Sequence, residues 1–262
     1  MTKFDEATQA IKVDDGVYDV CLDPGYAIGG PLNGGYLMAV MLRAAVDASP
    51  FEHPVSTTAQ FLKAPIAGPA QVRIEPLKAG RTAAFARATL VQDGVAHIEG
   101  LITTATLNEA EPVFEAPAQD MPSRAECVRL PDPKPDSGMT LNAQMELLFD
   151  PPTIGWLKGE PTGRPESRAY FRMAEPQDPD PYVLALAVDA LPPVVFSAGA
   201  RGWAPTVELT WHLRALPAPG WLTLLGGGRL ISDGWFDEEV EVRDSAGRLV
   251  AQSRQLARVG RG

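Results

Sequence analysis

The chain has 262 residues, of which 45% are hydrophobic, and a formal net charge of −10 at pH 7. This length is enough for a full hydrophobic core in one large domain or two smaller ones. The negative charge argues against nucleic acid and against an anionic membrane surface as partners. The acidic N-terminus lacks the apolar stretch of a signal peptide, so we expect a cytoplasmic protein.

A glycine-rich turn and an apolar helix dominate the first part of the chain. After the turn at 29–35, Arg43 is the only charged residue between Tyr36 and Val46, and neither glycine nor proline interrupts this segment. The pattern predicts a helix. At about 1.5 Å per residue this helix is ~20 Å long, too short to cross a bilayer. Because it is apolar on every side, other elements must wrap around it.

Extended segments rich in β-branched and aromatic residues are expected to supply that wrapping. One precedes the helix, and four follow it between turns of glycine, proline and polar residues. Asp93-Gly94, between the last two, is a strong hairpin signal. The first half therefore reads as one buried helix and an antiparallel meander. The predicted strands are 16–22, 60–65, 71–77, 83–91 and 95–107.

A linker is predicted at 108–144, where the chain is rich in proline, acidic residues and serine. The segment has neither helical nor strand periodicity, so it should lie extended on the surface. It divides the chain into an N-terminal unit, 1–107, and a C-terminal unit, 145–262. The lead-in and first strand of the second unit are expected at 145–156 and 168–173.

The second unit repeats the pattern of the first. The segment FLKA at 61–64 is matched by HLRA at 212–215, and a Pro/Ala/Gly turn follows each. Tyr36 in the first apolar helix matches Tyr182 in the second. The offsets are all about 150 residues, which indicates two copies of one helix-and-meander unit. The alternative is a chance likeness between two hairpin domains.

With these features the chain resembles the type II acyl-CoA thioesterases over nearly its whole length. The resemblance depends on the order and spacing of four features together: GGPLNGGYL at 29–37, Val188-Asp189, PTVELTWHLRA at 205–215 and DSAGRLVAQSRQLA at 244–257. It implies an α+β protein with a tandem hot-dog fold, in which each unit is a long central helix wrapped by a curved antiparallel sheet. It also implies hydrolysis of acyl-CoA.

The same resemblance implies an active site of Asp189, Thr206 and Gln255, all in the second unit. Asp189 would act as general base or orient a water molecule that Thr206 and Gln255 hold. Backbone N–H groups at a helix start would bind the developing oxyanion. The chain departs from the family where a histidine commonly follows the acidic residue of the site strand, because Leu209 follows Glu208 here.

The residues can also be read without the family. Asp189 lies in an apolar predicted helix, where an ionised carboxylate is unfavourable unless partnered. The alternative is that Asp189 lies on the solvent-exposed side of the helix or has a structural role as a hydrogen-bonding group. Gln255 is the one large polar residue on the inward face of a predicted strand, 248–259. A backbone partner could also satisfy it.

The sequence offers two threonines for the hydroxyl of the site. Strict alternation groups Thr206 with Glu208, Thr210 and His212, which suggests the outer face of the sheet. Thr206 follows Pro205 at the start of its strand, where alternation is least reliable. Thr210 is the alternative hydroxyl.

Other chemistries find less support. Cys21 and Cys127 are far apart, and no histidine is paired with a cysteine or second histidine at metal-ligand spacing. We therefore expect no metal and no cofactor. A non-catalytic acyl-thioester binding protein is the main alternative function. A hot-dog enoyl hydratase ranks lower, because no histidine lies at 29–36.

The two copies should differ in function. Arg43 takes the place of Asp189 in the first unit, and Ile102 or Thr103 takes the place of Gln255. We therefore expect one site per chain. We also expect a homodimer, because open sheet edges are commonly covered by another chain. Apolar residues around Trp203, Trp221 and Trp235 could contribute to its interface, whereas a charged run such as 237–239 could instead protect an edge.

Overall fold

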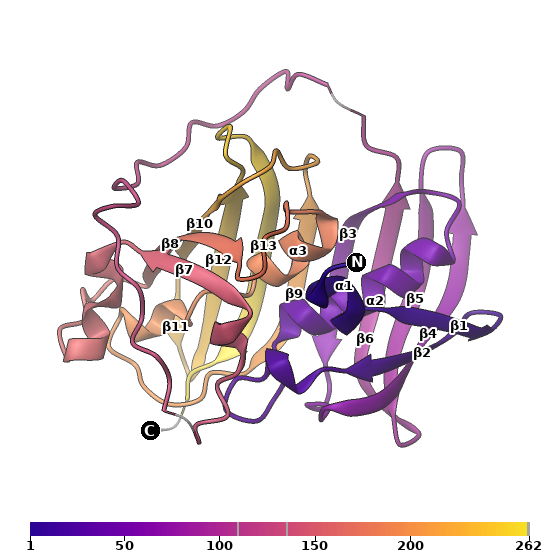
Figure 1. The fold of residues 1–262 in the computed structure, drawn as a ribbon, viewed down its shortest axis with the longest axis horizontal. Coiled ribbons are helices and arrows are strands. Elements are labelled where there is room, and N and C mark those ends of the chain that lie inside the picture. The colour runs from indigo at the N-terminus through magenta and orange to yellow at the C-terminus, as the bar shows by residue number, and fades with distance from the viewer. Residues whose placement is uncertain (109, 135, 261–262) are drawn as a thin grey trace.

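The apolar segment that follows Asn33 forms α2, the helix Gly34–Asp47, at the centre of the first half (Figure 1). The Asn33 side chain caps it by accepting a hydrogen bond of 2.8 Å from the backbone N–H of Tyr36. All residues from Gly35 to Leu42 are buried, as predicted for a helix apolar on every side. The computed structural model describes residues 1–108, 110–134 and 136–260.

The second central helix, α3, is shorter than the first and spans only Pro181–Ala187. Asp180 caps its start by accepting a 2.7 Å hydrogen bond from the N–H of Val183. The chain has to leave the helical conformation before Pro192, because proline restricts the residue that precedes it. Asp189 therefore lies in a turn just after the helix and not within it, which corrects the expectation from sequence.

Strands surround both helices, and most lie close to where the sequence places them. The predicted strand at 60–65 is wrong: the strand is β3, His53–Phe61, and the chain turns away from the sheet after Phe61. The remaining elements of the first half are α1 (Lys3–Ala7), β1 (Ala10–Asp14), β2 (Val17–Leu22), η1 (Pro24–Tyr26), β4 (Gly68–Ala79), β5 (Ala84–Gln92) and β6 (Val95–Ala105). Those of the second half are η2 (Leu141–Ala143), β7 (Met145–Phe149), η3 (Pro151–Lys158), β8 (Glu166–Met173), η4 (Val194–Phe196), β9 (Thr206–Leu213), β10 (Leu222–Gly227), β11 (Ile231–Ser232), β12 (Trp235–Arg243) and β13 (Leu249–Arg258).

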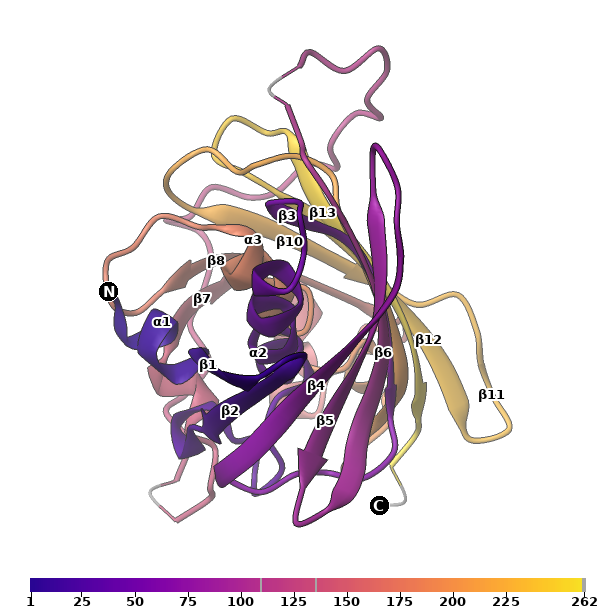
Figure 2. The ribbon, with the colours of Figure 1, turned by 90° about the vertical axis from the view of Figure 1, so that its right-hand side faces the viewer.

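The strands form one antiparallel sheet whose two halves have matching order. The order is β1-β2-β4-β5-β6-β3 in the first half and continues β9-β13-β12-β10-β8-β7 in the second. The halves join where β3 pairs with β9, with Thr58 opposite Thr210. Figure 2 shows the sheet curving around α2. This confirms the α+β arrangement of two helix-in-sheet units in one chain.

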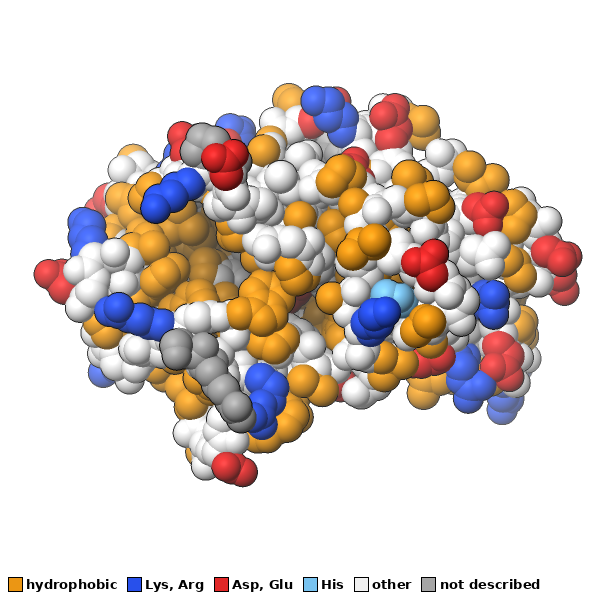
Figure 3. Space-filling view, turned by 90° about the horizontal axis from the view of Figure 1, so that it is seen from below, with side chains coloured by type: hydrophobic (Ala, Val, Ile, Leu, Met, Phe, Trp, Pro, Cys, Tyr) orange, Lys and Arg blue, Asp and Glu red, His pale blue; other side chains and the backbone are white. Residues whose placement is uncertain are grey.

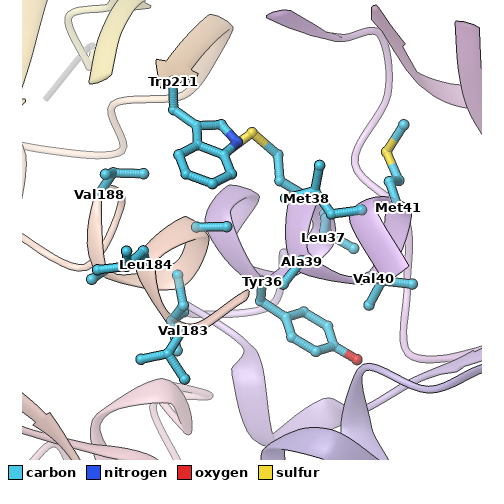
Figure 4. Packing of buried hydrophobic residues seen from close by; sticks show 14 of the residues in the cluster. Tyr36, Leu37, Met38, Ala39, Val40, Met41, Val183, Leu184, Val188 and Trp211 are labelled. Carbon is cyan, nitrogen blue, oxygen red and sulfur yellow. The ribbon is translucent and has the colours of Figure 1, made fainter. Parts of the chain in front are cut away.

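The core lies between the two helices and the inner face of the sheet. Side chains of α2, α3 and the fully buried Trp211 of β9 meet there (Figure 4). The helices approach so closely that a Cβ on Gly35 would lie 2.4 Å from the carbonyl oxygen of Ala185. Only glycine fits at this position, so the contact between the units depends on the glycine-rich turn found in the sequence.

The predicted linker crosses the surface of the second half (Figure 1). Among its described residues, none belongs to a helix or strand before Leu141. Glu115 binds it to the sheet: its Oε1 accepts hydrogen bonds from Arg243 Nη1, at 2.7 Å, and from the backbone N–H of Leu249, at 2.8 Å. The linker is thus anchored to the second unit, while the unit boundaries at 107 and 145 stay predictions.

Within the described part of the chain, no helix combines the length and apolar character needed to cross a membrane.

Candidate active site

The Asp189 carboxylate lies at the start of α2, the helix of the other unit. Its Oδ2 accepts a hydrogen bond of 2.9 Å from Asn33 Nδ2 and another of 2.9 Å from the backbone N–H of Gly35. The Asn33 amide also donates to the backbone oxygen of Asp189, at 2.8 Å. Negative charge is favoured at a helix N-terminus, where N–H groups point outward. The first unit therefore supplies the partners that make this carboxylate tolerable.

Two opposing effects set the proton affinity of Asp189. Burial raises its pKa to about 6, and hydrogen bonds from Gly35, Gly34 and Asn33 lower it in part. The side chain is therefore mostly ionised at neutral pH and still holds a proton well. A general base works best when its pKa lies near the working pH.

The start of α2 cannot be the helix start expected to bind the oxyanion. The N–H groups of Gly34 and Gly35 bind Asp189, and the N–H of Tyr36 donates to Asn33 Oδ1. A Cβ on Gly34 would also lie 3.0 Å from Asp189 Oδ2, so the helix start is closely fitted to the carboxylate. These donors are occupied by the protein itself and cannot serve a substrate oxygen at the same time.

A β-bulge in β9 turns Thr206 towards the interior. Glu208 pairs with Leu256 of β13, but Ala257 pairs with Thr206, so Val207 is an extra residue in β9. An extra residue reverses the alternation beyond it, and bulges often redirect side chains in this way next to active sites. The outward position that strict alternation suggested for Thr206 is therefore wrong.

Thr206 and Gln255 form a direct pair on the inner face. Thr206 Oγ1 donates a hydrogen bond of 2.6 Å to Gln255 Oε1, and Gln255 is only 7% exposed. The inward direction of Gln255 agrees with the periodicity of its strand. On the same face of β13, Ser253 Oγ donates to the backbone oxygen of Val188 at 3.4 Å, which holds this face against the turn that carries Asp189.

Thr210, the alternative hydroxyl, belongs to a different group. Its Oγ1 donates to Glu208 Oε1 at 2.6 Å and lies 2.9 Å from Thr58 Oγ1, where the two halves of the sheet join. The structure therefore places Thr206, and not Thr210, with Gln255.

Glu238 is a neighbour of this group that the sequence analysis missed. It lies opposite Gln255 in the pairing of β12 with β13 and is only 2% exposed. The charged run 237–239 does not protect a sheet edge, because β12 lies inside the sheet between β10 and β13. The alternation of β12 could have indicated Glu238 as inward, because buried Phe236 and Val240 flank it two residues away on each side.

The first unit has no equivalent set. Arg43, the counterpart of Asp189, forms an ion pair with Asp5 at 2.6 Å and stacks over the Tyr182 ring, 4.1 Å from its centre. Ile102, the counterpart of Gln255, is buried and apolar. The position of Arg43 is thus used to fasten the N-terminal segment and α3.

Comparison with known proteins identifies the family. A sequence model of the acyl-CoA thioesterase N-terminal domain matches residues 22–108, and one of the C-terminal domain matches residues 124–259. The chain belongs to the acyl-CoA thioesterase family. Within the described residues, no group of three or more His, Cys, Asp or Glu is placed to hold a metal ion.

Individual relatives agree with this assignment. A Thermobifida fusca protein provisionally named thioesterase II is 45% identical, and its crystal structure superposes with a TM-score of 0.93 over 100% of this chain and 98% of that one. A hot-dog protein from Alicyclobacillus acidocaldarius, 22% identical, covers 100% and 99% of the two chains with a TM-score of 0.87 and shows the fold alone. An uncharacterized Mycobacterium tuberculosis protein is 31% identical, covering 93% of this chain and 91% of its own length.

A cavity of about 330 Å³, whose lining includes Arg201 besides apolar residues, lies in the second half of this family member. It opens between η3 and the segment after η4, and its lining includes Trp156, Leu157, Pro161, Phe196 and Ala200. Two features connect the cavity to the site. Val194, at the start of η4, donates its N–H to Glu238. The lining residues 199–202 precede Thr206 by only a few residues in the sequence. Gly260 packs against Gly202 and Trp203, so this region adjoins the C-terminal end. Figure 3 shows one face of the molecule, which is hollowed and has hydrophobic side chains in the hollow.

Proposed function

We propose that the chain hydrolyses acyl-CoA thioesters to a free acid and coenzyme A, with a water molecule held by Asp189, Thr206 and Gln255. The observation that carries this proposal is the hydrogen bond from Thr206 to the buried Gln255, on the sheet face that packs against the turn with Asp189. Membership in the acyl-CoA thioesterase family supports the substrate class.

Asp189 and Thr206 each accept one hydrogen of the water molecule in this proposal. Asn33 and Gly35 both bind Oδ2 of Asp189, so we assign Oδ1 to accept a proton from the water. The Thr206 hydroxyl donates to Gln255, which leaves its oxygen free to accept the second hydrogen of the water. The water oxygen is then held with a lone pair directed at the thioester carbonyl carbon.

The reaction follows from this arrangement. The water oxygen bonds to the carbonyl carbon while Asp189 takes a proton, and the π electrons of the C=O bond move to the carbonyl oxygen. The C=O bond then re-forms as the C–S bond breaks. The sulfur takes the proton from Asp189 and leaves as the thiol of coenzyme A. General base catalysis of this kind contributes roughly 10² to 10⁴ in rate.

The acyl group would occupy the cavity beside η4. Its walls combine apolar side chains with Arg201, and about 330 Å³ lies at the small end of the range for ligand pockets. Trp156 and Phe196 form a tilted ring pair, with centroids 5.0 Å apart, which offers a flat apolar surface to a short acyl chain or an aromatic acyl group.

A thiol-release assay tests the proposal. The purified chain is incubated with acyl-CoAs of graded length and with an aromatic acyl-CoA, and free thiol is followed with a thiol reagent. Hydrolysis releases one thiol for each thioester consumed. A non-catalytic acyl-thioester binding protein would bind the same compounds, measured by calorimetry, without releasing thiol, and that result would refute the proposal.

A further inference from the structure

Glu238 is a buried acid that the proposed mechanism does not yet use. Its side chain lies on the inner face of β12, directly opposite Gln255 of β13. Oε2 accepts a hydrogen bond of 2.9 Å from the backbone N–H of Val194, in the turn that borders the cavity. Glu238 thus lies between the start of η4, whose Phe196 lines the cavity, and Gln255 of the candidate site.

The surroundings of Glu238 make it unfavourable for stability. Its pKa is raised to about 8, and burial is the largest cause. The hydrogen bond from Val194 lowers the pKa, the nearby negative charge of Asp189 raises it, and the Gln255 amide lowers it. A well-packed apolar side chain is often more stabilising at such a position than a buried ionisable group. The adjacent Glu239 is different, because it faces outward and pairs with Arg229 at 2.8 Å.

The polarity of the Gln255 amide explains what Glu238 can do. An amide has one end that accepts and one that donates hydrogen bonds. Thr206 Oγ1 donates to Oε1, so the accepting end faces Thr206. The donating end, Nε2, is the end left for the carboxylate of Glu238, which lies directly opposite Gln255 on the same face of the sheet. If the amide were reversed, Nε2 would donate to Thr206 Oγ1, and the Thr206 hydroxyl hydrogen would lose its acceptor. That hydrogen would be free to turn towards the water, which needs an acceptor at this place.

We propose that Glu238 is a positioning residue that fixes the direction of the Gln255 amide and thereby leaves the Thr206 oxygen free for the attacking water. The inference rests on the proposed hydrolysis. It assigns to Glu238 an effect on the rate of the chemical step that is exerted through Gln255 and not through direct contact with substrate.

The variant Glu238→Gln, assayed at pH 9, where the wild-type carboxyl is ionised and can only accept hydrogen bonds, tests this role with almost no change of volume. Its carbonyl oxygen can still accept the N–H of Val194, but its NH₂ group then faces Gln255 and forces that amide to reverse. We expect kcat to fall roughly tenfold to hundredfold, because small errors in positioning have effects of this size. KM should change by no more than about twofold, because the substrate contacts are retained.

Glu239→Gln is the matched control, because it makes the same replacement one residue along on the outer face. It should leave kcat unchanged. Both variants should show a cooperative thermal unfolding transition, as expected of folded proteins. A Glu238→Gln protein with the kcat of the control would overturn the proposal.

A double-mutant cycle with Gln255→Ala separates positioning from a purely structural effect. If Glu238 acts through Gln255, then adding Glu238→Gln to Gln255→Ala should leave kcat within about twofold of the single Gln255 variant. If Glu238→Gln lowers kcat by its full factor in that background as well, the proposed role is wrong.

The two proposals fail in different ways. A wild-type chain that releases no thiol from any acyl-CoA refutes the hydrolysis proposal, and the role of Glu238 with it. An active wild type with Gln255→Ala unimpaired refutes the site assignment and the action of Glu238 through that amide. An active wild type in which Gln255→Ala is impaired and Glu238→Gln is not refutes the role of Glu238 alone.

Discussion

Asp189 shows how one side chain can be both unfavourable to bury and firmly held. The turn after α3 removes it from water, while Asn33 and the N–H groups of Gly34 and Gly35 replace the lost hydration. Burial is the larger effect, and the raised pKa records this. A carboxylate kept this basic can accept a proton from water, which a solvated aspartate does poorly.

Asp189→Asn should abolish most hydrolysis without unfolding the protein. The amide oxygen can still accept hydrogen bonds from Asn33 and Gly35, so the fold is retained, but the general base is lost. We expect the rate to fall by roughly 10² to 10⁴, measured by thiol release. A normal thermal melt is the control, and turnover within about threefold of wild type would contradict the assignment.

The rate and the stability should depend on pH in opposite directions around Asp189. Because its pKa in the folded state is about 6, hydrolysis should rise about tenfold per pH unit below pH 6. Above pH 6 the only further rise expected is the one that accompanies ionisation of Glu238 through about pH 8. The pKa is raised from 3.8, so the folded state binds the proton more tightly than the unfolded state. The stability from this group is present below about pH 4 and is lost as pH rises through 6.

Measurements of kcat and of chemical unfolding between pH 4 and pH 9 check both trends. Asp189→Asn should flatten the stability trend between pH 4 and pH 6. An unchanged slope there would show that other groups, and not Asp189, determine it.

At the scale of elements, the bulge in β9 is the feature that builds the site. A regular strand would have turned Thr206 outward, together with Glu208 and Thr210. The extra residue Val207 brings it to the inner face beside Gln255.

Thr206→Ala and Thr210→Ala form a matched pair that tests this assignment. The first removes an acceptor for the water, and we expect its kcat to fall roughly tenfold to hundredfold. The second removes a hydroxyl that bonds Glu208 and Thr58 at the join between the units, so its kcat should stay within about twofold of wild type. If Thr210→Ala were the more damaging change, the assigned hydroxyl would be wrong.

At the scale of the molecule, the two units are unequal copies that complete one another. The second unit carries Asp189, Thr206 and Gln255, while the first supplies the helix start that binds Asp189. In the first unit, Arg43 and the apolar Ile102 stand at the corresponding positions. One complete set of candidate site residues thus arises from two similar halves.

We therefore predict one binding site per chain. Titration of the protein with a nonhydrolysable acyl-CoA analogue in a calorimeter should give one ligand per chain. Two equivalent sites per chain would contradict this prediction.

We also propose that the chain forms a homodimer. The apolar surface around the three tryptophans, expected to contribute to the dimer interface, is smaller than predicted. Arg172 stacks over the Trp221 ring, and Arg258 stacks over the Trp235 ring. Trp203 remains 51% exposed, and the edge strand β1 exposes Ile11 and Val13. Apolar side chains on an open edge favour pairing with a second copy.

Light scattering at micromolar concentration should then give about twice the 28.1 kDa mass of one chain. A mass of one chain that does not change on concentrating the sample would refute the dimer.

The sequence by itself determined the architecture and part of the site. The apolar segment after the glycine-rich turn had to be a buried helix, and the repeated pattern indicated a second unit. Alternation along β13 was enough to place Gln255 inside, because a regular strand separates its two faces by position alone. These features depend on the local pattern of side chains, which folding preserves.

Tertiary structure alone decided which of these groups meet. Asn33 and Asp189 are distant in sequence, and only the packing of α2 against the turn after α3 brings them together. Thr206 faces inward because of a bulge whose position depends on the pairing of β9 with β13, and Glu238 reaches Gln255 through the pairing of β12 with β13. Register and close helix contact are properties of the assembled sheet, so periodicity within one strand could not reveal them.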